Sequence, residues 1–151
     1  MEKDELKTLN EWGKDLGKKL QDLADVRASD LVDIAQQTGR FLCGGKYRDT
    51  KKKEPQTVNL KVNQVRRFLD AVRRIESVVK GKEFDSTIED SITLLRVKLA
   101  YAAGREEHVK PLMNVLDPAI RSGAKSQPNF EKLLRLVEGI IAYHRFYGGT
   151  N

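Results

Sequence analysis

The sequence predicts an all-α fold of five to six helices with no sheet. Apolar residues recur at three- and four-residue spacings along most of the chain, whereas the two-residue alternation of a half-buried strand is absent. Glycines, prolines and capping side chains divide these apolar stripes into separate segments. We expect a single domain, because 151 residues are enough to bury one substantial core.

Two helices are expected in the first part of the chain. A stripe of leucines spans residues 6–23, although Gly13 and Gly17 weaken that helix. Ser29 is a favourable N-cap for the second helix, and the glycines at 44–45 are expected to end it. These two helices pack either on the rest of the bundle or on a neighbouring molecule.

A flexible basic loop is expected at residues 46–57, because this segment has almost no apolar side chain to bury. The helix at 63–80 follows, and three further stripes complete the chain. Ser86 is expected to cap the first of them, Pro118 to kink or end the second, and Asn129 to cap the third. The chain 1–151 thus divides into N-terminal helices (1–45), the loop (46–57) and a helical core (58–149).

Positive charge is concentrated in one quarter of the chain. The formal net charge is +6, and residues 41–80 hold 11 basic but only 4 acidic side chains. Such a local excess attracts polyanions such as nucleic acid. No apolar run approaches the ~20 residues of a membrane span, and no secretory signal opens the chain. We therefore expect a cytoplasmic protein with no membrane partner.

The strongest functional signal is the pair of arginine doublets in the 63–80 helix. Arg66, Arg67, Arg73 and Arg74 lie opposite its apolar stripe, and guanidinium groups match the geometry of phosphate oxygens. The alternative is a solvated face that Asp70 partly neutralises. Five basic loop residues form a second candidate set, whose alternative is a disordered linker: Lys46, Arg48, Lys51, Lys52 and Lys53.

Nothing in the sequence predicts catalysis. His108 and His144 are the only histidines, and neither has a partner at metal-ligand spacing. We expect no metal, no cofactor and no enzymatic activity, and His144 is expected to pack or to face a phosphate. The single cysteine, Cys43, cannot form an intrachain disulfide.

Three short segments are more specific than composition: NQVRRF at 63–68, KLAYAAGR at 98–105 and GIIAYHRFYGG at 139–149. With these segments in this order, the chain resembles the small subunit of type III-A CRISPR effector complexes, the Csm small-subunit family. The resemblance covers residues 58–149. It implies a non-catalytic helical bundle, several copies of which stack into an inner filament beside the crRNA-binding subunits.

The resemblance also implies partners and contacts. The partners are single-stranded target RNA, the crRNA–target duplex, other Csm subunits and further copies of the chain. The RNA backbone is contacted without sequence preference, and the matching basic positions are Arg66, Arg67, Lys98 and Arg105. Tyr143 and His144 match the terminal aromatic motif. On physical grounds the apolar residues of the middle segment are expected to pack: Leu99, Tyr101, Ala102 and Ala103.

Two other functions remain open at this point. A helical DNA-binding regulator would read base edges with the N-terminal residues of one helix. Here the cations run along the side of the helix instead, which favours contact with a backbone. An RNA-processing enzyme is the least favoured, because the sequence offers few acid–base groups and no metal cluster.

Overall fold

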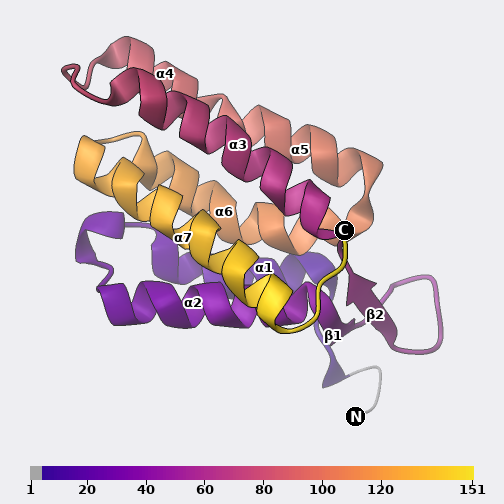
Figure 1. The fold of residues 1–151 in the computed structure, drawn as a ribbon. Coiled ribbons are helices and arrows are strands. Elements are labelled where there is room, and N and C mark those ends of the chain that lie inside the picture. The colour runs from indigo at the N-terminus through magenta and orange to yellow at the C-terminus, as the bar shows by residue number, and fades with distance from the viewer. Residues whose placement is uncertain (1–4) are drawn as a thin grey trace.

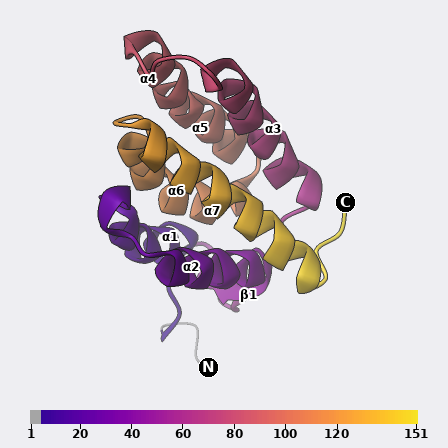
Figure 2. The same cartoon turned by 60° about the vertical axis from the view of Figure 1, so that its left-hand side comes forward.

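The computed structural model describes residues 5–151 as three stacked layers of helices with a β-hairpin at one end (Figure 1). Viewed from a second direction, α3, α4 and α5 lie on one side of the central helices α6 and α7, and α1 and α2 lie on the other (Figure 2). The helices are α1 (Leu9–Gly17), α2 (Ala28–Phe41), α3 (Val62–Val79), α4 (Ser86–Thr93), α5 (Leu95–Arg105), α6 (Lys110–Gly123) and α7 (Gln127–Phe146). The strands are β1 (Cys43–Tyr47) and β2 (Gln56–Asn59). The prediction of a mostly helical fold is confirmed.

The central layer, α6 and α7, buries apolar side chains on both of its sides, because other helices cover each side. Leu116, Ile120, Leu133 and Ile140 of α6 and α7 are completely buried. Pro118 was expected to kink or end its helix, yet α6 continues through it to residue 123. A proline removes one helical hydrogen bond to the residue four positions earlier, and α6 continues without that bond.

The first layer, α1 and α2, is held against the central layer by close backbone approaches. A Cβ atom added at Gly17 would lie 2.5 Å from the carbonyl oxygen of Asn114, the group that Pro118 deprives of its helical donor. A Cβ atom added at Gly39 would lie 2.7 Å from the backbone nitrogen of His144. Within this layer, Trp12 stacks on Phe41 with ring centroids 3.8 Å apart. The glycines that weaken α1 as an isolated helix are therefore what lets it dock.

The hairpin contradicts the prediction of no sheet, and it shortens the predicted loop at both ends. β1 and β2 pair antiparallel, with Lys46 opposite Thr57 and Tyr47 opposite Gln56. The register shifts between residues 43 and 46, where Gly44 has a φ of 112°, which favours glycine. The glycines at 44–45 therefore form the first strand rather than ending α2.

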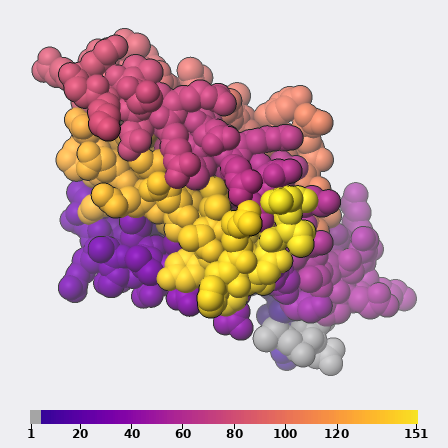
Figure 3. Space-filling view, viewed as in Figure 1, coloured from indigo at the N-terminus to yellow at the C-terminus, as the bar shows by residue number. Residues whose placement is uncertain are grey.

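The outer layer packs the predicted stripe of α3 inward. Val65, Phe68, Leu69 and Val72 are all buried. The carbonyl of Thr150 accepts a hydrogen bond from the backbone nitrogen of Val62, so the C-terminal segment crosses the start of α3, as Figure 3 shows. Within residues 5–151, none of the helices has the length and hydrophobicity needed to cross a bilayer.

Candidate nucleic-acid interface

Within each arginine doublet of α3, the two side chains lie on different flanks of the helix. Arg73 donates a 3.1 Å hydrogen bond to Glu138, so its flank of α3 faces α7. Arg67 lines a groove on the α5 side instead. All four arginines are exposed, and within residues 5–151 no carboxylate forms an ion pair with Arg66, Arg67 or Arg74. The intrahelical neutralisation by Asp70 that the sequence allowed is not formed.

A groove of about 670 Å³ lies between α3 and α5, and its rim is basic. Arg67 comes from α3, while Lys98 and Arg105 come from α5 and are two turns apart. Three of the four positions that the resemblance marked for RNA contact therefore converge on one concave surface. The fourth, Arg66, is exposed on the neighbouring flank of α3 and is not part of the groove lining.

The outer face of α5 differs from its predicted packing at one residue. Leu99 and Ala103 are buried as expected, but Tyr101 is 68% exposed. The guanidinium carbon of Arg105 lies 5.7 Å from the centre of the Tyr101 ring, within cation–π range. Tyr101 belongs to the groove rather than to the core.

The basic residues of the hairpin have different structural roles. Arg48 donates to Glu11 at 3.0 Å and to the carbonyl of Leu6 at 3.3 Å, which ties the hairpin to the start of α1. Lys46 donates to Thr57 across the two strands at 2.6 Å. The lysines at 51–53 are exposed on the connecting turn, which projects from the same end of the molecule as the C-terminus of α5 (Figure 1).

The structure corrects the position of His144 among the candidates. Its side chain is completely buried, so it does not face a phosphate, and burial lowers its pKa despite the nearby backbone groups of Leu60 and Leu42. Neither ring nitrogen has a well-aligned hydrogen-bond partner among the described residues. We therefore leave His144 out of the interface.

His108 joins the hairpin to the connection between α5 and α6. Its Nδ1 accepts a hydrogen bond from the backbone nitrogen of Asn59 at 3.1 Å, and its Nε2 lies 3.3 Å from the hydroxyl of Tyr47. Burial, followed by the nearby acidic groups, raises the pKa of Tyr47. The imidazole thus fixes the hairpin beside the end of the groove, which is a structural role.

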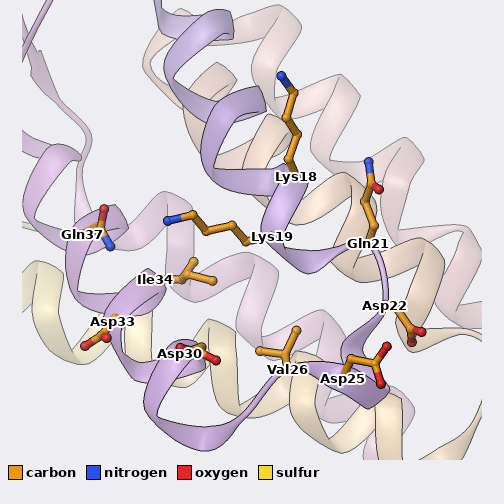
Figure 4. A pocket seen from close by; sticks show the side chains of 10 residues that line it. All are labelled: Lys18, Lys19, Gln21, Asp22, Asp25, Val26, Asp30, Asp33, Ile34 and Gln37. Atoms are coloured by element: carbon orange, nitrogen blue, oxygen red, sulfur yellow. The ribbon is translucent and has the colours of Figure 1, made fainter.

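A second hollow, on the first layer, has the opposite electrostatic character. It lies between α2 and the connection that follows α1, where Asp22, Asp25, Asp30 and Asp33 line it and the lysines come from the connection only (Figure 4). Within residues 5–151 no group of three or more His, Cys, Asp or Glu side chains is arranged to hold a metal ion. The hollow on the first layer is therefore lined mainly by acidic side chains, whereas the groove on the outer layer is lined mainly by basic ones.

The sequence also contains an exposed apolar stripe beside the basic residues of the groove. Leu94, which directly precedes α5, and Val97 and Tyr101 within it recur at three- and four-residue spacing on the side opposite the buried stripe of α5. A second apolar stripe on one helix indicates a second contact surface. Its members are among the large exposed apolar side chains of the described residues.

These features define a class: a small helical bundle that presents a basic groove on one outer layer and an acidic hollow on the other. Comparison with known proteins shows which family the chain belongs to. The chain matches the model of the family described as Csm2 Type III-A over residues 25–150. It is 33% identical over 95 residues to the CRISPR system Cms protein Csm2 of Streptococcus thermophilus, an alignment that covers 61% of this chain and 76% of that protein.

The chain belongs to the Csm2 family, the small subunits of type III-A Csm complexes. The family match begins at residue 25 and so includes α2 and the hairpin. It extends further toward the N-terminus than the segment at 58–149 on which the sequence motifs lie.

Proposed function

We propose that this chain is a non-catalytic RNA-binding subunit of a type III-A CRISPR interference complex in the cytoplasm. It contacts target RNA, single-stranded or paired with crRNA, through backbone phosphates and without sequence preference. The observation that carries the proposal is the convergence of Arg67, Lys98 and Arg105 on one groove. Membership in the Csm2 family supports the same conclusion.

Unpaired cations strengthen this interface. Arg66, Arg67, Arg74 and Lys98 have no ion-pair partner among the described residues, so phosphate binding does not first require breaking a salt bridge. Each phosphate that they neutralise releases condensed counterions, which makes the affinity depend on salt. Arg73, already bonded to Glu138, is a secondary contact.

The hairpin extends the proposed contact surface beyond the groove. Its exposed turn at 51–53 carries three lysines close to the end of the molecule where α5 ends. Arg48 and Lys46 are secondary here, because each already bonds a protein group. The tip lysines add electrostatic attraction rather than a fixed geometry.

Assembly is part of the proposal. We place the chain beside other Csm subunits and further copies of itself in an inner filament. One groove binds RNA weakly, but copies arrayed along one RNA strand raise the effective concentration of each successive site. The chain contributes no cleavage chemistry, and cleavage belongs to other subunits.

The test is fluorescence anisotropy of a labelled single-stranded RNA of ~40 nucleotides, titrated at several salt concentrations. We expect Arg66→Ala with Arg67→Ala to weaken binding of all sequences and to flatten the salt slope by roughly one unit per lost phosphate contact. The matched control is Lys18→Ala with Lys19→Ala, which removes the same charge beside the acidic hollow. Equal changes in both variants would show that only net charge matters and would remove the groove from the proposal.

A further inference from the structure

The α3–α5 groove has more apolar surface than phosphate binding requires. Leu94, Val97 and Tyr101 are 62%, 63% and 68% exposed along its α5 side. They do not serve the core, since Leu95, Leu99 and Ala103 fill that role on the opposite face of the same helix segment. Phosphate oxygens are bound by cations and hydrogen-bond donors, so these exposed apolar side chains lack a function in the proposed backbone contact.

The groove combines two kinds of chemistry within a short distance. Its buried apolar lining includes Phe68 and Leu112, and among the described residues its rim carries Arg67, Lys98 and Arg105 against a single acidic residue, Glu106. Arg105 lies over the ring of Tyr101, which orients the aromatic side chain while leaving most of it accessible. An accessible aromatic ring with cations around it is the arrangement that binds a nucleobase and its flanking phosphates.

We propose that this groove binds an unstacked base of single-stranded RNA. The base lies against Tyr101 and the neighbouring Val97, and the phosphates on either side of it contact Arg67, Lys98 and Arg105. This inference rests on the proposed RNA-binding function and adds a base contact to it. Any of the four bases satisfies the site, because stacking requires only a π-face.

The excess of rim cations favours RNA over a protein side chain as the occupant. Of the residues that the structure describes, three basic and one acidic line the groove, a balance that complements a phosphodiester chain. The amide of Gln64, at the α3 edge, is half-buried and available to hydrogen-bond a base edge or a 2′-hydroxyl.

The test compares two oligonucleotides that carry the same number of phosphates: a single-stranded RNA and its abasic counterpart. We expect the protein to bind the RNA on the order of tenfold more tightly, because only the RNA provides a base for Tyr101. Tyr101→Leu should remove this preference, whereas Tyr101→Phe should keep it. The salt slope should not change in either variant, since neither removes a charge.

Two further measurements sharpen the test. A 2-aminopurine placed within the RNA should change its fluorescence on binding to the protein, because it exchanges its neighbouring bases for Tyr101, and this change should be absent on binding to Tyr101→Leu. Phe146→Leu is the matched control, because Phe146 is a 76% exposed aromatic residue outside the groove. Its base preference should equal that of the unsubstituted protein.

The outcomes separate this inference from the function on which it rests. Equal, salt-dependent binding of the RNA and the abasic strand would overturn the base site and leave the phosphate interface intact. If neither strand binds at low salt, both the base site and the phosphate interface are overturned. If Tyr101→Leu changes self-association in sedimentation but not base preference, the groove is a protein contact and the inference is wrong.

Discussion

The first layer, α1 and α2, and the outer layer, α3 to α5, meet the central helices in different ways. The first layer approaches the central one at glycines, where an added Cβ at Gly17 or Gly39 would fall within 2.5–2.7 Å of a backbone atom. The outer layer packs through side chains, and at Gly104 of α5 nothing lies within 4 Å of the same added atom. The first layer uses its small residues to gain close packing, whereas the glycine of α5 in the outer layer lies beside open space. Whether a glycine in a helix is required for close packing therefore depends on the atoms that surround it in the folded protein.

The largest expected effect is on the free energy of unfolding, and it tests whether the outer layer is stabilised by its buried face. Leu99 is 2% exposed, so Leu99→Ala should lower the free energy of unfolding by about 2–5 kcal/mol. Leu94 is 62% exposed, and Leu94→Ala should change it by less than about 0.5 kcal/mol. Urea unfolding of the two variants checks both values. Equal losses would mean that the two faces of this segment are not distinct.

The next effect tests the comparison of glycines directly. Alanine is the better helix former at both sites, so propensity alone predicts stabilisation by Gly39→Ala and by Gly104→Ala. At Gly39 the new methyl group meets the backbone of α7, and we expect a loss of about 1–3 kcal/mol. At Gly104 the space is open, and we expect a gain of about 0.5–1 kcal/mol. The same sign at both sites would contradict the difference between the layers.

The smallest effect concerns pH and the buried His144 beside the first layer. Burial lowers its pKa, so the unfolded chain binds a proton more readily than the folded one. Stability should therefore fall as pH drops below about 6.5, the ordinary histidine pKa, and should be constant above it. Melting temperatures between pH 7.5 and 5.5 measure this slope.

His144→Gln is the control for that slope, since it removes the titrating group. The variant should lose the pH dependence in this window even if it is less stable throughout. Glu11, Asp15 and Asp117 have lowered pKa values, so their contributions are lost only at more acidic pH. An unchanged slope in His144→Gln would assign the effect to another group.

Most of the helical fold could be predicted because helical periodicity is a local property. The stripe of Val65, Phe68, Leu69 and Val72 is buried as its spacing indicates. Cap positions were harder to predict, because neighbouring polar residues can each serve as the N-cap of one helix. At the start of α4 the side chain of Asp85, not that of Ser86, accepts the capping hydrogen bond. Likewise Ser126 caps α7, and Asn129 donates to Ser122 instead.

The hairpin could not be predicted from the same pattern. Its alternation involves only a few residues, of which Tyr47 and Val58 are buried, and its glycines are equally good helix terminators. The hairpin is fixed by contacts distant in sequence: His108 with Tyr47 and Arg48 with Glu11. Residue spacing within one segment carries no information about such contacts.

The candidate site shows the same limit. Periodicity placed the arginines of α3 on an exposed face, but only the packing of α3 alongside α5 brings Arg67 into the same groove as Lys98 and Arg105. The exposure of Tyr101 and the burial of His144 also depend on that tertiary arrangement. A charged side chain can be assigned to the surface from sequence, whereas its partners across a groove cannot.

The hairpin turn is also a place where the chain could be cut without separating its two parts. Residues 51–53 are exposed lysines, and the segments before and after them are held together by α1 on α6 and α2 on α7. A trypsin cut in this turn should leave two fragments that stay associated without a covalent link. The same position offers a place to insert an epitope, or to split the protein into two halves whose reassembly reports on folding inside a larger particle.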